Sequence, residues 1–140
     1  MILEVNGVSF SYKSRDALRD VTFSVNEHEI LGILGPNGVG KTTLLKCINM
    51  LLRPSSGSVL LESHDLTTLH VREIAKKAGY VPQRIETNRT TAFDAILLGR
   101  HPHFGTQLTD ADLEKVDAAI SMMDIQNLSL QYINEMSGGD

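Results

Sequence analysis

A glycine-rich segment between an apolar run and an amphipathic stretch constrains this sequence more than any other feature. Residues 35–43 read Gly-Pro-Asn-Gly-Val-Gly-Lys-Thr-Thr, a glycine followed by four residues and then Gly-Lys-Thr. The apolar run 30–34 precedes it, and Leu44, Leu45 and Ile48 follow at helical spacing. A strand, a turn and a helix in this order bring backbone N–H groups together at a helix N-terminus, where they can bind phosphate oxygens. The segment therefore predicts a loop that binds a polyphosphate.

The residues of this loop have separate predicted roles. Its glycines allow positive backbone angles and a close approach of the main chain to an anion. Lys41 is expected to bring a positive charge to the β- and γ-phosphates, and Thr42 to offer a hydroxyl to Mg²⁺. An ordinary glycine turn is the alternative, and the flanking strand and helix patterns argue against it. The predicted phosphate-binding set is Gly35, Pro36, Asn37, Gly38, Val39, Gly40, Lys41, Thr42 and Thr43.

The bulk properties of the chain narrow the class of protein. It has 140 residues, which suffices for one domain with a buried core. A net charge of -4, with basic and acidic residues interspersed, gives no basic stripe, so nucleic acid is not an expected partner. The single cysteine, Cys47, lies on the apolar side of the helix predicted after the loop, which favours a buried reduced thiol and a cytosolic compartment. No apolar run approaches the roughly 18 residues that a membrane-spanning helix needs, and the N-terminus does not resemble a signal peptide.

The first part of the chain carries strand and helix patterns. We expect short antiparallel strands within residues 2–10 and further elements, namely strands at 17–25, 30–34, 58–62 and 78–81 and a helix at 69–77. The run 30–34 is apolar without interruption, which is typical of a strand buried on both faces of a sheet. The helix after the loop is expected to end near Arg53, because Pro54 disfavours a helical conformation of the residue before it.

After Gln83 the pattern becomes helical. Thr91 and Thr109 are predicted helix N-caps, each with an aspartate three residues later. One apolar stripe recurs at three- and four-residue spacing, formed by Leu113, Val116, Ile120 and Met123. We therefore divide the chain into an α/β nucleotide-binding core, residues 1–83, and a helical subdomain, residues 84–140.

Four motifs in a fixed order give the sequence a family resemblance. They are Ser11-Tyr12, the loop at residues 35–43, Tyr80-Val81-Pro82-Gln83 and Met136-Ser137-Gly138-Gly139-Asp140. Along its whole length the chain resembles the nucleotide-binding subunit of ATP-binding cassette (ABC) transporters. The resemblance implies an α/β fold, a P-loop NTPase cassette core with an N-terminal antiparallel β part and a helical subdomain, without the C-terminal part of the core. It also implies ATP and Mg²⁺ as cofactors.

Tyr12 and Gln83 acquire roles from this resemblance. Tyr12 occupies the position of the aromatic residue that stacks on adenine, and a π-face stacks on any base. Without the resemblance, a tyrosine that fills a gap at a strand end would be the preferred interpretation. Gln83 matches the glutamine that contacts Mg²⁺ or the attacking water and reports γ-phosphate occupancy, although alone it would be read as a solvated turn residue. The resemblance thus implies Lys41 and Gln83 as catalytic residues, and Thr42 and Gln83 as metal ligands.

Ser137, Gly138 and Gly139 resemble the signature motif of the family. A serine hydroxyl and glycine amides at a helix N-terminus can hold an anion. The resemblance implies that this anion is the γ-phosphate of ATP bound by a second copy of the subunit, in a head-to-tail dimer. Met136 replaces the usual leucine with little change in volume, whereas Asp140 is shorter than the usual glutamine or glutamate. By itself, Ser-Gly-Gly is a common loop.

Residues 97–103, Leu-Leu-Gly-Arg-His-Pro-His, resemble a segment of the branch that imports iron–siderophores, haem or cobalamin. The resemblance implies a membrane permease as partner and a peripheral position on the cytoplasmic face of the cell membrane. His101 and His103 have no third metal ligand nearby in the sequence, so a surface or permease contact is expected of them. The solute cannot be predicted, because the ATPase subunit does not touch it.

In the family, a Walker B strand with an Mg²⁺-linked Asp and a catalytic Glu follows the signature motif, and this sequence stops at Asp140. Residues 59–62 form the nearest apolar run that ends in an acid, but they lack paired carboxylates. Phosphoryl transfer needs those groups, so we expect this chain to bind ATP without hydrolysing it. Two other functions stay open: a nucleotide-dependent ABC-type assembly or regulatory module without transport, and a phosphate-loop NTPase outside the family.

Overall fold

A computed structural model describes residues 1–13, 15–83, 89–105 and 107–136 of the chain. The chain forms two compact units, Met1–Tyr80 and Val81–Asp140, each of which is described by itself. No helix in the described part is long and apolar enough to cross a membrane. The division into units falls next to Gln83, where the pattern of the sequence changes.

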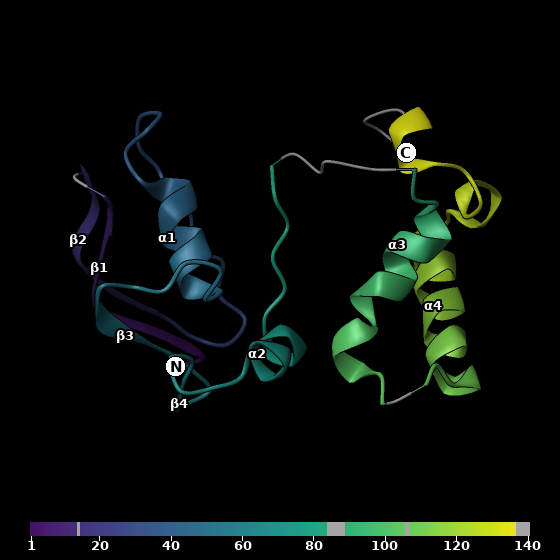
Figure 1. The fold of residues 1–140 in the computed structure, drawn as a ribbon, viewed down its shortest axis with the longest axis horizontal. Helices are drawn as coiled ribbons and strands as arrows, with labels where there is room; N and C mark the ends of the chain where they lie inside the picture. Colours follow the sequence, from purple (N-terminus) through teal and green to yellow (C-terminus); the bar gives the residue numbers. More distant parts are fainter. Residues whose placement is uncertain (14, 84–88, 106, 137–140) are drawn as a thin grey trace. The chain divides into compact units, whose positions relative to one another are not determined.

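The first unit contains an antiparallel sheet and two helices (Figure 1). Its strands lie in the order β2-β1-β3-β4, with β1 paired to both β2 and β3. The sheet is the antiparallel β part that the sequence predicts. The elements are β1 (Leu3–Tyr12), β2 (Arg15–Val25), α1 (Lys41–Ile48), β3 (Ser56–Leu61), β4 (His64–Asp65) and α2 (Val71–Lys77).

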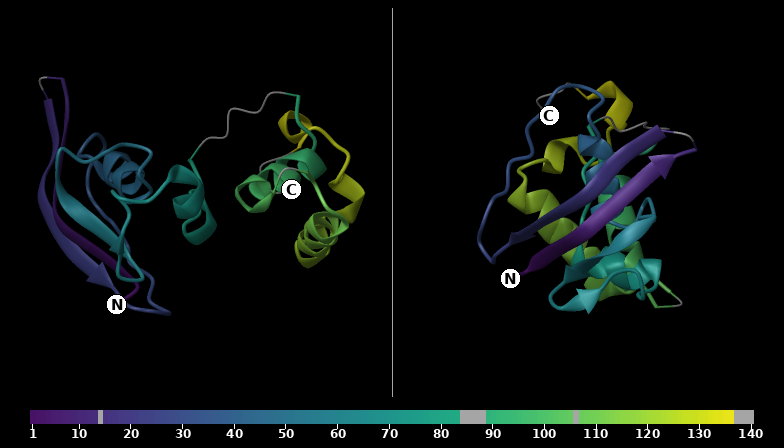
Figure 2. Two further views of the ribbon diagram at one scale, coloured as in Figure 1. Left: turned by 60° about the horizontal axis from the view of Figure 1, so that its bottom comes forward. Right: turned by 90° about the vertical axis from the view of Figure 1, so that its left-hand side faces the viewer.

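The core of this unit lies between one face of the curved sheet and α1 (Figure 2). Val5, Val8 and Val59 are fully buried, and Leu44 and Cys47 of α1 pack in the same cluster. The register shift between Val5 and Val8 brings both valines, three residues apart, to the same face of β1, and the three-residue spacing on α1 directs Leu44 and Cys47 to the same interface. Cys47 is the buried free thiol that the sequence predicts, and burial raises its pKa.

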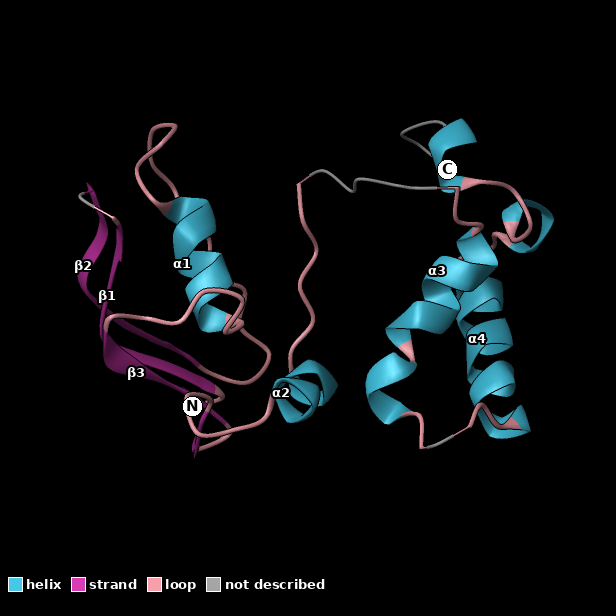
Figure 3. Cartoon of the chain, viewed as in Figure 1, coloured by secondary structure: helices cyan, strands magenta, loops and turns pink. Residues whose placement is uncertain are grey.

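The predicted buried strand at residues 30–34 is wrong. The chain between β2 and α1 contains no strand among the described residues (Figure 3). Ile30 is 100% exposed and Leu34 is 94% exposed, although Ile33 packs against the core. The physical reason is that a strand needs a neighbour to supply ladder hydrogen bonds, and none of the four described strands lies beside this run.

Three other boundaries differ from the sequence-based expectation. Residues 78–81 form no strand, because they too have no hydrogen-bonded partner strand among the described residues. The one continuous strand β1 (Leu3–Tyr12) replaces the short strands expected within residues 2–10, since a register shift between Val5 and Val8 accommodates the Asn-Gly pair. Helix α1 ends at Ile48, because the chain turns at Met50 with a φ of 55°.

The second unit is helical. Its elements are α3 (Ala92–Gly99), η1 (His101–His103), α4 (Asp110–Met122), η2 (Gln126–Leu128) and η3 (Ile133–Glu135). Thr91 caps α3 by accepting the Asp94 N–H, and Thr109 opens a capping box with Asp112, so both predicted N-caps are confirmed. In the predicted stripe of α4, Val116 and Ile120 are buried, but Met123 is 63% exposed because the helix has already ended.

The start and the end of the helical stretch meet in a backbone contact, which we call the clasp (residues 90–93 with 129–133). Thr91 and Tyr132 form an antiparallel bridge. Three hydrogen bonds extend it, namely Ala92 N to Gln131 O at 3.0 Å, Phe93 N to Ser129 O at 2.8 Å and Ile133 N to Thr90 O at 3.0 Å. The Arg89 guanidinium lies 5.9 Å from the centre of the Tyr132 ring, a cation–π distance.

Candidate functional site

The glycine-rich loop runs directly into the N-terminus of α1. Gly40 is the N-cap of the helix with a φ of 110°, and Gly38 has a φ of 78°. Both angles lie in the left-handed region that favours glycine. Within the described part of the chain no side chain caps α1, so the N–H groups of its first turn remain available to a ligand.

Gly40 is also required by the approach of β2. A Cβ on Gly40 would lie 2.5 Å from the carbonyl oxygen of Ala17, closer than any side chain tolerates. At Gly38, by contrast, a Cβ would meet nothing within 4 Å. The loop is therefore supported by β2 on one side and open at its middle.

The two polar side chains at the start of α1 differ in their contacts. The Lys41 ammonium donates to the carbonyl oxygens of Gly35 at 2.6 Å and Pro36 at 2.8 Å, so it lies folded over the loop. Thr42 is exposed, and its hydroxyl makes no hydrogen bond with the described residues. An accessible hydroxyl beside an anion site fits the oxygen ligands that Mg²⁺ prefers.

The connection between β1 and β2 brings Tyr12 and Arg15 to the loop. The Tyr12 hydroxyl lies 3.4 Å from the Thr43 hydroxyl, and the Tyr12 ring packs edge-on against Phe10 with 4.8 Å between centroids. Nearly half of Tyr12 is exposed, at 47%, so the ring can accept a stacking partner. The aromatic at the end of β1 thus lies beside the helix that follows the loop.

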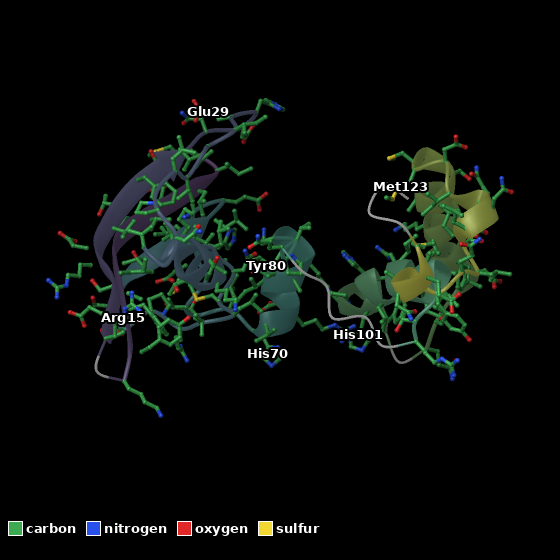
Figure 4. The ribbon with its side chains drawn as sticks, turned by 90° about the horizontal axis from the view of Figure 1, so that it is seen from above. Arg15, Glu29, His70, Tyr80, His101 and Met123 are labelled. Carbon is green, nitrogen blue, oxygen red and sulfur yellow. The ribbon has the colours of Figure 1, made fainter. Side chains whose placement is uncertain are left out.

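Arg15 is a site residue that the sequence analysis did not select. Its Nη2 donates to the carbonyl oxygen of Gly38 at 3.3 Å. Figure 4 shows Arg15 at the start of β2, and Glu29 beyond the other end of that strand. The signal in the sequence was a cation three residues after the predicted adenine-stacking tyrosine, but hairpin packing was needed to show what it contacts.

The remaining predicted residues lie outside the first unit. Gln83 is exposed and belongs to the second unit. Ser137, Gly138 and Gly139 lie outside the described residues. Among the described residues, no group of three or more His, Cys, Asp or Glu side chains could hold a metal ion.

The loop, the uncapped α1 and the apposed tyrosine have the geometry of a phosphate loop at a helix N-terminus. The profile of the ABC transporter family matches residues 18–140. The chain therefore belongs to the ABC transporter family.

Curated relatives match almost the whole chain. An ABC transporter ATP-binding protein of Methanocaldococcus jannaschii is 48% identical over 100% of this chain and 55% of its own length. The manganese transport system ATP-binding protein of Listeria innocua is 37% identical, covering 98% of this chain and 57% of its own length. The petrobactin import ATP-binding protein of Bacillus subtilis is 30% identical over 99% of this chain and 55% of its own length. The chain thus spans little more than half the length of these relatives.

A solved structure has the same fold. A dimeric ATP-binding cassette in a post-hydrolysis state, with ADP and Pi bound, aligns with a TM-score of 0.80 and 25% sequence identity. The alignment covers 98% of this chain and 64% of that chain. The fold is therefore that of an ABC cassette of which this chain represents part, as the sequence predicts.

Proposed function

We propose that this chain is part of the ATP-binding subunit of an ABC importer, which couples ATP binding and hydrolysis to solute uptake. The observation that carries the proposal is the loop of residues 35–40, open at Gly38 and leading into the uncapped N-terminus of α1. At the end of the loop, Lys41 supplies an ammonium group and Thr42 supplies an exposed hydroxyl. This combination suits a polyphosphate with a bound Mg²⁺.

The nucleotide is proposed to bind along the first unit. Backbone N–H groups of the loop and Lys41 would hold the phosphates, Thr42 would ligate Mg²⁺, and Tyr12 would stack on adenine. The metal would neutralise phosphate charge and orient the phosphate chain. Lys41 would have to move from the Gly35 and Pro36 carbonyls to the phosphate, which its flexible stem allows.

Family membership supports the proposed partners. A second copy is proposed to pair head to tail, with its Ser137, Gly138 and Gly139 closing over the γ-phosphate. Gln83 would contact Mg²⁺ or the attacking water and link the site to a membrane permease, so that the subunit works at the cytoplasmic face of the membrane. The dimeric state of the matched solved cassette supports the pairing.

The solute is proposed to be an iron–siderophore, haem or cobalamin, on the resemblance of residues 97–103. The relative named for petrobactin import supports this reading. The relative named for manganese transport shows that cassettes of similar identity also serve another cargo. The proposal therefore names a group of solutes and no single one.

Binding is tested by titrating the 140-residue chain with a fluorescent ATP analogue in the presence of Mg²⁺. Lys41→Ala removes the phosphate-facing cation and should weaken binding by about tenfold or more. Lys46→Ala removes a cation from the last turn of the same helix and should leave affinity unchanged. Absence of saturable binding by the unsubstituted chain, or equal losses in the two variants, would overturn the proposal.

Hydrolysis is proposed to need groups outside these 140 residues. The chain alone should therefore release no phosphate from ATP above the background rate. Steady phosphate release that disappears in Lys41→Ala would contradict this, because it would place a complete catalytic set within the chain.

A further inference from the structure

The end of the β1–β2 hairpin contacts the phosphate loop region at three successive points. Arg15 donates to the Gly38 carbonyl at 3.3 Å, and Ala17 O lies 2.5 Å from the position that a Cβ of Gly40 would take. Tyr12 approaches the Thr43 hydroxyl at 3.4 Å. The contact at Gly38 differs from the other two, because it is made by a charged side chain to the loop's own main chain.

Among the described residues, the side-chain hydrogen bonds to carbonyls of residues 35–40 come from only two residues. Lys41 donates to Gly35 and Pro36, and Arg15 donates to Gly38. The present inference rests on the proposed function, in which Lys41 turns to the phosphates. The loop would then keep a single side-chain tether, the one from Arg15.

The hydrogen bond from Arg15 fixes the orientation of the peptide unit between Gly38 and Val39. The peptide that joins Gly38 to Val39 is trans, as are all others in the described chain, so its N–H points opposite to its C=O. Holding the Gly38 carbonyl toward Arg15 therefore directs the Val39 N–H away from Arg15. Gly38 has a φ of 78° and no steric neighbour, so the peptide could rotate easily without the tether.

We propose that Arg15 is a positioning residue for the polyphosphate, acting through the Gly38 carbonyl to keep the loop amides directed at the anion. A guanidinium suits this role, because it is always charged and its donors are fixed in one plane. Its charge also adds to the positive potential at the loop. Lysine can keep the charge and one hydrogen bond, but it lacks the planar group.

The experiment measures the affinity of the 140-residue chain for two probes, ATP and inorganic tripolyphosphate, each with Mg²⁺. Tripolyphosphate competes against a fluorescent ATP analogue. The variants are Arg15→Gln, Arg15→Lys and the matched control Arg19→Gln, whose arginine lies on the same strand and pairs with Asp16 at 2.9 Å. Thermal unfolding of each variant is recorded in parallel.

Arg15→Gln should weaken binding of both probes by the same factor, roughly tenfold, which corresponds to the loss of one charge-assisted hydrogen bond. Arg15→Lys should recover part of the affinity, and Arg19→Gln should not change it. The unfolding temperature of Arg15→Gln should match that of Arg19→Gln.

Two results would overturn the role of Arg15 alone. Equal affinity of Arg15→Gln and the unsubstituted chain would exclude positioning. A loss for ATP without a loss for tripolyphosphate would mean that Arg15 contacts the base or ribose instead. If the unsubstituted chain bound neither probe, the proposed function would fail together with this inference.

Discussion

The carboxylate of Asp112 accepts a hydrogen bond from Arg100 Nη2 at 2.9 Å, which joins the start of α4 to the residue that follows α3. The same carboxylate accepts the Thr109 hydroxyl at 2.7 Å and the Thr109 N–H at 3.2 Å. Only 7% of Asp112 is exposed. One buried acid therefore caps α4 and fixes α3 against it.

Asp112→Asn should destabilise the second unit at neutral pH. The Thr109 hydroxyl, then the Arg100 guanidinium, lower the pKa of the Asp112 carboxyl, against the opposing effect of burial. A lowered folded-state pKa stabilises the protein above the unfolded carboxyl value of about 3.9. That stabilisation is lost as the pH falls through the folded-state value.

Urea unfolding at pH 7 and at pH 3 measures this effect. The stability difference between the unsubstituted chain and Asp112→Asn should be present at pH 7 and smaller at pH 3. Asp117→Asn, at an exposed position of α4, should show little difference at either pH. A difference for Asp112→Asn that does not change with pH would contradict the assignment.

Thr91→Ala should lower the stability of the second unit by about 1 kcal/mol, the usual cost of losing an N-cap. The Thr91 hydroxyl oxygen accepts the Asp94 N–H at 3.1 Å, and its hydroxyl donates to the Asp94 carboxylate at 2.7 Å. Thr91→Ser retains the oxygen and should recover most of the loss. Chemical denaturation followed by circular dichroism compares the two, and equal stability of both variants would argue against a capping role.

The run 30–34 should cause the 140-residue chain to associate. Leu34 exposes 94% of its surface next to a backbone without a ladder partner, and exposed apolar segments of this kind promote pairing between chains. Leu34→Lys should reduce association. Met122→Lys, at a position that is 87% exposed on the helical unit, should leave it unchanged. Sedimentation velocity over a range of concentrations gives the answer, and a strictly monomeric unsubstituted chain would refute the prediction.

The Cys47 thiol should react slowly with a thiol reagent in the folded protein. It is 0% exposed, and its raised pKa reduces the fraction of reactive thiolate. Labelling at pH 8 with a chromogenic disulfide should be much faster in urea than in buffer. Equal rates in the two conditions would mean that the core around α1 opens readily.

Features that depend on local chemistry were predictable from the sequence. The glycine turn that leads into α1 and the caps at Thr91 and Thr109 each depend on residues that are near one another in the chain. On α1, helical spacing correctly indicated Leu44 as buried, but Leu45, which the same spacing selected, is 41% exposed. At both caps the threonine and its aspartate partner are three residues apart.

Features that depend on distant neighbours were not predictable in the same way. The run 30–34 has the composition of a buried strand, yet composition cannot supply a hydrogen-bonding partner. Arg15 looked like an ordinary turn residue, because its contact with Gly38 requires the hairpin to fold onto the loop. Helix α1 ends earlier than predicted because Met50 adopts a positive φ, and no residue pattern in the sequence indicated this.

The clasp has a consequence for how this part of the protein can vary. Residues 90–93 lie beside residues 129–133, so the segment that contains α3 and α4 begins and ends at the same place. Segments whose ends lie together tolerate replacement better than segments that bridge distant points. The helices between the two halves of the clasp could therefore be exchanged for those of a relative by grafting at Thr91 and Tyr132, with the course of the flanking backbone preserved.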